Sequence, residues 1–260
     1  MLVKERIIGE LAQIEIEKQV KILYACESGS RAWGFPSVDS DYDVRFIYVH
    51  PVEWYLSIAD KRDVIEKIDG LLDLSGWELR KALRLFRKSN PALLEWLQSP
   101  VVYWEATVIP TMMKEMTDKT FSSRSSLYHY LNMARGNFRE YLQGEWVKSK
   151  KYFYVLRPIL ACMWIEEYHT VPPMEFKVLL NALLPEGQLK NAIQDLLRRK
   201  RAGDELTAEP RIGVINDFIN RQLEHFQTLL EGEEGIVPVG EQEFDGLFRR
   251  ALKESWGQYL

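Results

Sequence analysis

The stretch Cys26–Tyr48, CESGSRAWGFPSVDSDYDVRFIY, decides how this chain is interpreted. It contains a Gly-Ser pair, an aromatic loop, and two aspartates one residue apart that open an apolar segment. Residues 20–25 before it, VKILYA, are apolar and β-branched and predict a short buried strand. Residues 44–49, VRFIYV, predict a second strand, which His50-Pro51 ends. The predicted order is therefore strand, Gly-Ser turn, short helix or loop, and a strand led by Asp-x-Asp.

The two aspartates, Asp41 and Asp43, are candidate metal ligands. Because they lie two residues apart, an extended backbone directs both side chains to the same face. Adjacent carboxylates repel each other, and a divalent cation relieves that repulsion. Hard oxygen ligands in this arrangement suit Mg²⁺ or Mn²⁺, which also bind substrate phosphates.

The Gly-Ser pair preceding them is a candidate phosphate-binding turn. Gly29 allows backbone to approach a ligand closely, and Ser30 adds a hydroxyl beside amides at a possible helix start. A phosphate site at the turn and a metal site at the aspartates together describe a site for a nucleoside triphosphate. The alternative is ordinary turn chemistry, in which the aspartates and the glycine serve only the local backbone.

These residues resemble a known family. Gly29-Ser30-Arg31 followed by Ser40–Val44 resembles the signature of the polymerase-β-type nucleotidyltransferase superfamily. The run from Gly29 to Val49, with Trp54-Tyr55 and GWELRKAL later, is most similar to the RNA-ligase-associated polymerase-β-like predicted nucleotidyltransferases. The resemblance implies an NTP substrate, Mg²⁺ or Mn²⁺, and nucleotide binding by Gly29, Ser30 and Arg31.

A third carboxylate is expected at Asp73. Residues 63–68 and 71–74 predict two strands joined by a turn at Asp69-Gly70, and Asp73 interrupts an otherwise apolar strand. An unpaired carboxylate there is costly, and a two-metal site requires a third acidic ligand from a neighbouring strand. The resemblance places that ligand at Asp73. Glu66 is a weaker candidate for this ligand. The alternative role for Asp73 is helix capping near Ser75. Ser75 is the predicted N-cap of a helix over 76–88, and Glu78 would complete its capping box.

The rest of the chain predicts an α+β protein. Apolar residues at helical spacing from Val3 to Ile14 predict an amphipathic helix that covers the sheet. After Pro110 the periodicity is almost entirely helical, with a predicted linker at Phe121–Ser126. We therefore expect a nucleotidyltransferase domain with a mixed sheet and flanking helices over 1–115, and a C-terminal helical bundle over 116–260. The cleft between them is expected to bind the nucleotide.

The helical half contains a basic stretch between Arg124 and Arg157, with seven lysines and arginines against two glutamates. Lys150 and Arg157 fall on one predicted helix face, and the run KKYFYVLRP is a block shared with the resembled family. Cations beside a cleft would neutralise a triphosphate, so Lys150, Lys151 and Arg157 are predicted nucleotide-binding residues. The alternative is a solvated basic helix face.

Composition sets limits on the remaining function classes. The 260 residues are 46% hydrophobic and 28% charged, with a net charge of −4, which does not favour a surface that coats nucleic acid generally. The two cysteines and four histidines lack metal-ligand spacing and form no disulfide framework. No apolar run reaches the length of a membrane span, and no secretory signal is evident, so we expect a cytoplasmic protein. The sequence predicts no particular oligomeric state.

The predicted activity is transfer of a nucleoside monophosphate from an NTP to an acceptor hydroxyl, with release of pyrophosphate. Asp41, Asp43 and Asp73 would be the catalytic metal ligands. The resemblance implies RNA, such as a tRNA end, as the acceptor, and hence a role in RNA processing. Nucleotidylation of a small molecule, AMPylation of a protein, and a catalytically inactive nucleotide-binding regulator are the alternatives.

Overall fold

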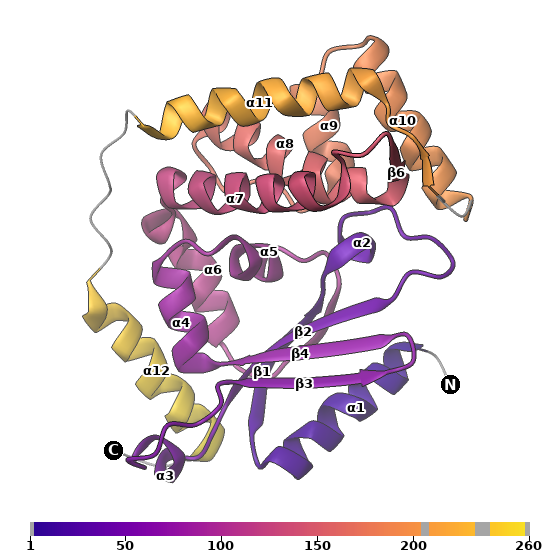
Figure 1. The fold of residues 1–260 in the computed structure, drawn as a ribbon. Coiled ribbons are helices and arrows are strands. Elements are labelled where there is room, and N and C mark those ends of the chain that lie inside the picture. Colours follow the sequence, from indigo (N-terminus) through magenta and orange to yellow (C-terminus); the bar gives the residue numbers. More distant parts are fainter. Residues whose placement is uncertain (1–2, 204–207, 232–239, 258–260) are drawn as a thin grey trace. The chain divides into compact units, whose positions relative to one another are not determined.

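The computed structural model describes residues 3–203, 208–231 and 240–257 (Figure 1). The chain forms two compact units. One holds the described residues within Met1–Ala32, Asp41–Thr120 and Pro238–Leu260; the other holds those within Trp33–Ser40 and Phe121–Val237. No helix of the described residues is both long and apolar enough to cross a membrane.

The first unit is built on a five-stranded mixed sheet in the order β3-β4-β2-β1-β5. Strands β2 and β4 are parallel, and the other neighbouring pairs are antiparallel. The predicted strands and the β3–β4 hairpin are present, and a further strand, β5, follows Pro100 and lies at the border of the sheet. The strands are β1 (Lys21–Glu27), β2 (Tyr42–Val49), β3 (Val64–Asp69), β4 (Leu72–Glu78) and β5 (Val102–Glu105).

Helices cover both faces of this sheet, which buries its apolar side chains (Figure 1). On one face the predicted amphipathic helix α1 buries Ile7, Leu11 and Ile14 against residues of β1, β2 and β4. On the other face the Tyr24 hydroxyl donates to the carbonyl of Trp96 in α5, at 2.8 Å. The helices of this unit are α1 (Val3–Lys18), α2 (Gly29–Ala32), α3 (Val52–Tyr55), α4 (Leu79–Arg87), α5 (Pro91–Leu97), α6 (Ile109–Thr120) and α12 (Glu241–Trp256).

The prediction of a helix over 76–88 with Ser75 as its N-cap is wrong for the first turn of that helix. Strand β4 continues to Glu78, because its backbone stays in parallel register with β2 as far as the pair Tyr48↔Glu78. Gly76 lies under the ring of Phe46, where a Cβ would come within 2.1 Å of a ring carbon, so this residue fits a strand in close contact. Helix α4 begins at Leu79, and the Glu78 side chain is its N-cap, accepting from the Arg80 amide at 2.9 Å.

The second unit is largely helical, as predicted. Its elements are α7 (Ser123–Tyr141), β6 (Trp146–Lys148), the 3₁₀ turn η1 (Ser149–Lys151), α8 (Tyr152–Tyr168), α9 (Phe176–Leu183), α10 (Gln188–Arg201), β7 (Ala208–Pro210) and α11 (Gly213–Glu231). The predicted linker Phe121–Ser126 is wrong from its third residue on, because Ser122 already caps α7 by accepting from the Ser125 amide. Helix α8 lies at the centre of the core, with its residues from Tyr152 to Leu160 buried except Tyr154.

The loop Trp33–Ser40 belongs to this helical unit although it interrupts the first one in sequence. Phe35 is buried, with its ring centroid 4.8 Å from that of Phe153 and 5.4 Å from that of Phe176. The predicted segments 1–115 and 116–260 are continuous, whereas both compact units are assembled from separate pieces of chain. The assignment of catalysis to one part and of nucleotide contacts to the other stays a prediction.

Candidate active site

The parallel pairing of β2 and β4 brings two aspartates together. Asp43 is the direct register partner of Asp73, each being the second residue of its strand. Partners in a parallel pair direct their side chains to the same face. The pairing itself depends on the apolar residues that follow, since Val44 and Leu74 are buried in the sheet core. The sheet therefore holds two half-buried carboxylates side by side at one end of its central strands.

Arg45 joins these two carboxylates. Its Nη2 lies 3.1 Å from Asp43 Oδ1 and 2.8 Å from Asp73 Oδ2, and its Nη1 donates to the Asp73 carbonyl at 2.9 Å. The guanidinium thus compensates the charge of both carboxylates. The sequence analysis did not identify Arg45, although its position two residues after Asp43 places both on one face of the strand.

Asp41 lies at the entrance of β2 and is exposed. Its carbonyl accepts from Arg31 Nε at 3.1 Å, and the Arg31 guanidinium lies 3.7 Å from the ring centroid of Tyr42. Burial raises the pKa of Asp43, and the charges of Asp73 and Asp41 raise it further against the opposing effect of Arg45. Asp41 and Asp73 therefore both lie close enough to Asp43 to act on it electrostatically.

Gly29 lies directly against the Asp43 carboxylate. A Cβ at this position would be 2.1 Å from Asp43 Oδ2, and the backbone φ of +58° is one that residues with a side chain rarely adopt. The preceding amide, that of Ser28, donates to the Asp43 carbonyl at 2.8 Å. Ser30 follows within the short helix α2 and is partly exposed. The Gly-Ser turn and the Asp-x-Asp strand are thus adjacent in space.

A further acidic residue, Glu27, is buried beside this site and makes a hydrogen bond with the backbone of Asp43. It is fully buried at the end of β1, accepts from the Asp43 amide at 2.8 Å, and accepts a short hydrogen bond from the Tyr103 hydroxyl. Burial raises its pKa above the ordinary value for a glutamate. The sequence analysis did not identify Glu27; the available signal was a glutamate directly after an apolar strand.

The donor set is chemically suited to a hard divalent cation, although the side chains are not gathered into a preformed cage. In the described part of the chain, no group of three or more His, Cys, Asp or Glu side chains is positioned to hold a metal ion. Asp43 and Asp73 each direct one oxygen to Arg45, the other oxygen of Asp43 lies against Gly29, and the two side chains are 29% and 39% exposed. Carboxylate oxygens partly open to solvent are ligands that Mg²⁺ accepts together with water and phosphate.

The three basic residues predicted to bind the nucleotide belong to the helical unit and differ in exposure. Lys150 is exposed in η1, before α8 begins. The Lys151 ammonium lies 3.8 Å from the ring centroid of Tyr141 and 5.1 Å from that of Tyr154. Arg157 is only 1% exposed, donates to the Met174 carbonyl at 3.4 Å, and lies over Trp33. The sequence placed Lys150 and Arg157 on one helix face, but the structure encloses Arg157 in the core of this unit.

Three comparisons identify the relatives of this chain. A protein of Bacillus subtilis (strain 168) called YcgL is 54% identical over 254 residues, covering 97% of this chain and 98% of the relative. The crystal structure of a nucleotidyltransferase-like protein from Exiguobacterium sibiricum 255-15 matches 96% of this chain and 81% of its own at 13% identity, with a TM-score of 0.33. That likeness is too weak to bear on the fold or the activity.

The family comparison covers almost the whole chain. Residues 3–250 match the model of the RNA repair pathway DNA polymerase beta family, RlaP. This match confirms the resemblance drawn from the Gly-Ser turn and the Asp-x-Asp strand. The chain therefore belongs to the RNA repair pathway DNA polymerase beta family and is a nucleotidyltransferase of the polymerase-β type.

Proposed function

We propose that this protein transfers a nucleoside monophosphate from an NTP to an acceptor hydroxyl at the site formed by Asp41, Asp43 and Asp73. One observation carries the proposal: Asp43 and Asp73 are register partners on parallel strands, and the Asp43 carboxylate lies directly against Gly29 of the Gly-Ser turn. A structural ion pair alone would need Arg45 and the two aspartates, but it would not need a glycine turn packed directly against Asp43 Oδ2.

The proposal includes Mg²⁺ or Mn²⁺ held by Asp41, Asp43 and Asp73. A bound divalent cation would supply positive charge to the phosphates and lower the pKa of a coordinated hydroxyl. Arg45 already makes polar contacts with Asp43 and Asp73, so it orients both carboxylates toward one side. Glu27 fixes the backbone of Asp43 through the amide hydrogen bond and thereby positions its side chain.

The Gly-Ser turn is proposed to bind the triphosphate. Gly29 has no side chain to exclude a phosphate from the neighbourhood of Asp43, and Ser30 is partly exposed beside it. Arg31 is held by the Asp41 carbonyl and the Tyr42 ring, which places its charge next to the same turn. We retain Lys150 and Lys151 as proposed nucleotide contacts, but do not extend the proposal to Arg157, which is enclosed in the core of its unit.

The reaction is a substitution at the α-phosphorus. The acceptor oxygen forms a new bond to that phosphorus, the bond to the bridging oxygen of the β-phosphate breaks, and pyrophosphate leaves with the electron pair. The hydroxyl proton passes to solvent. Positioning and charge stabilisation provide most of the catalysis in reactions of this type, which is consistent with a site composed of carboxylates, arginines and a glycine turn.

The acceptor is proposed to be RNA, such as the end of a tRNA, and the support for this is the description of the family. Incubating the protein with each α-labelled NTP, Mg²⁺ or Mn²⁺, and total RNA tests this directly, because the label stays with the transferred nucleotide. Label recovered in RNA supports the proposal. Label recovered on a small molecule or on protein would identify that molecule, instead of RNA, as the acceptor. If no label were transferred to any of them, the protein would be a nucleotide-binding regulator.

A further inference from the structure

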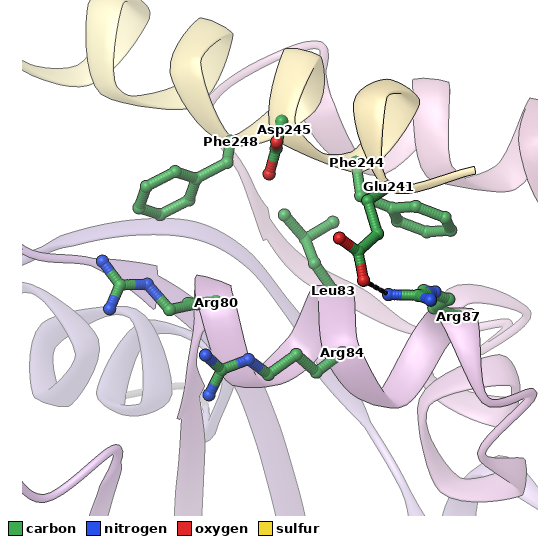
Figure 2. Close-up of a pocket in the computed structure, with 8 residues that line it drawn as sticks. All are labelled: Arg80, Leu83, Arg84, Arg87, Glu241, Phe244, Asp245 and Phe248. Carbon is green, nitrogen blue, oxygen red and sulfur yellow. Dashed lines mark hydrogen bonds and ion pairs between the residues drawn. The ribbon is translucent and has the colours of Figure 1, made fainter. Parts of the chain in front are cut away.

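A pocket of about 380 Å³ lies between α4 and α12 in the first unit (Figure 2). Figure 2 shows arginines reaching from α4 on one side, while Phe248 and Asp245 project from α12 on the other. The volume falls in the range of about 300–1,000 Å³ that is typical of small-ligand sites. None of the residues of the proposed active site lines this pocket.

One wall of the pocket is basic. Helix α4, LRKALRLFR, has four basic and no acidic side chains, and Arg80, Arg84 and Arg87 recur at helical spacing toward α12. Arg87 is paired with Glu241. Arg84 is exposed and makes no hydrogen bond or ion pair within the described residues. The pocket therefore presents at least one cation that is available to a bound anion.

The other wall combines apolar rings with a carboxylate. Phe244 is buried against Phe86, with their ring centroids 6.0 Å apart. Phe248 is half-buried, with its ring centroid 4.9 Å from that of Tyr55 and 5.5 Å from the Arg80 guanidinium. Asp245 is exposed on the same helix, and within the described residues it is not engaged in an ion pair or hydrogen bond. Thus an aromatic surface, a cation and a hydrogen-bond acceptor border one space of nucleotide size.

Resting on the RNA acceptor proposed above, we propose that this pocket binds one nucleotide of a single-stranded RNA. An aromatic side chain stacks on the face of an unpaired base, an arginine donates hydrogen bonds to the phosphate, and a carboxylate accepts hydrogen bonds from ribose hydroxyls. Phe248, Arg84 and Asp245 supply these three groups from facing helices. An assignment to an anion such as phosphate alone would leave the acidic and aromatic wall without a role.

This pocket is separate from the carboxylate site. Asp73 is the second residue of β4 and Glu78 is the last, five positions further on, which corresponds to about 16 Å at roughly 3.3 Å per residue. Arg80 lies beyond Glu78, in the first turn of α4. The pocket would therefore contact a part of the RNA other than the nucleotide that reacts, and its occupancy can be measured without any transfer.

Fluorescence anisotropy with a labelled single-stranded oligoribonucleotide, without NTP or divalent metal, tests the proposal on the full chain. We expect Arg84→Ala to weaken RNA binding about tenfold, because a charge-assisted contact is lost. The slope of log K against log salt should fall by about 0.7, the value of one phosphate contact on a single strand. Arg249→Ala is the matched control, since Arg249 is an exposed arginine of α12 that does not line the pocket.

Comparison of RNA with DNA of the same sequence tests the role of Asp245. The wild-type protein should bind the RNA more tightly, and Asp245→Asn should reduce that preference. Equal losses for Arg84→Ala and Arg249→Ala, or no loss for either, would overturn the site. A third outcome would be that Arg84→Ala weakens the binding of labelled AMP but not of RNA. That result would overturn RNA as the ligand of this pocket and indicate a site for a free nucleotide.

Discussion

Replacing Gly29 by alanine should remove most of the transfer activity, and the size of the loss follows from a distance in the structure. The added Cβ would lie 2.1 Å from Asp43 Oδ2, whereas ordinary van der Waals contact begins at 3.4 Å. The carboxylate must therefore move by about 1.3 Å, the difference between these two distances. A displacement of about 1 Å in a reacting site costs on the order of 10²-fold in rate. We expect Gly29→Ala to lower the rate of nucleotide transfer by at least about that factor.

The same substitution also strains the backbone, and a second glycine separates the two effects. Gly70 has nearly the same φ, +61° against +58° for Gly29, but a Cβ there meets no atom within 4 Å. Both alanine variants should lose about 1–2 kcal/mol of unfolding free energy through the left-handed backbone. Only Gly29→Ala should lose activity.

Two measurements decide between these expectations: transfer of α-labelled NTP to RNA, and the thermal unfolding midpoint of each variant. If Gly29→Ala retained the activity of Gly70→Ala at a similar midpoint, the Asp43 carboxylate could not be a ligand whose position matters. The metal assignment would then be refuted together with the role of the glycine.

Further predictions concern the carboxylates and the lysines. Asp43→Ala should abolish transfer while leaving the thermal midpoint nearly unchanged, and near wild-type transfer would contradict the proposed metal site. Burial raises the pKa of Glu27 in the folded state. When the pH is above the ordinary pKa of a glutamate, the folded state therefore binds more protons than the unfolded state, and the free energy of unfolding falls as the pH rises. Glu27→Gln should therefore gain in thermal midpoint relative to wild type as the pH rises above about 4.5, the ordinary pKa of a glutamate, and a difference that does not change with pH would refute the linkage. Replacing Lys150 and Lys151 together by alanine should raise the KM for NTP with little change in kcat, and an unchanged KM would leave that stretch as a solvated basic surface.

The local part of the site could be predicted from sequence because its signals are local. Gly29, Asp41 and Asp43 lie within fifteen residues, and their spacing alone indicates a tight turn followed by a strand with both carboxylates on one face. Asp73 required the resemblance, since nothing in residues 71–74 specifies that this strand pairs with β2 in the register Asp43↔Asp73.

Tertiary contacts explain what the sequence did not reveal. The prediction of a helix from residue 76 relied on Ser75 as a cap, but pairing with β2 and the ring of Phe46 over Gly76 keep this segment in the sheet. Glu27 becomes a partner of Asp43 only when β1 and β2 pair. The burial of Arg157 depends on Trp33 and Met174, which are distant in sequence.

The return of the chain to the first unit through α12 has a consequence for how this protein can be dissected. Residues 1–115 include the strands and every carboxylate of the proposed site, yet Leu83 and Phe86 of α4 are buried on the side to which α12 contributes Phe244. An expressed fragment ending near residue 115 would uncover this apolar surface and tend to self-associate. A minimal catalytic fragment should instead join residues 241–256 to the sheet through an engineered connection.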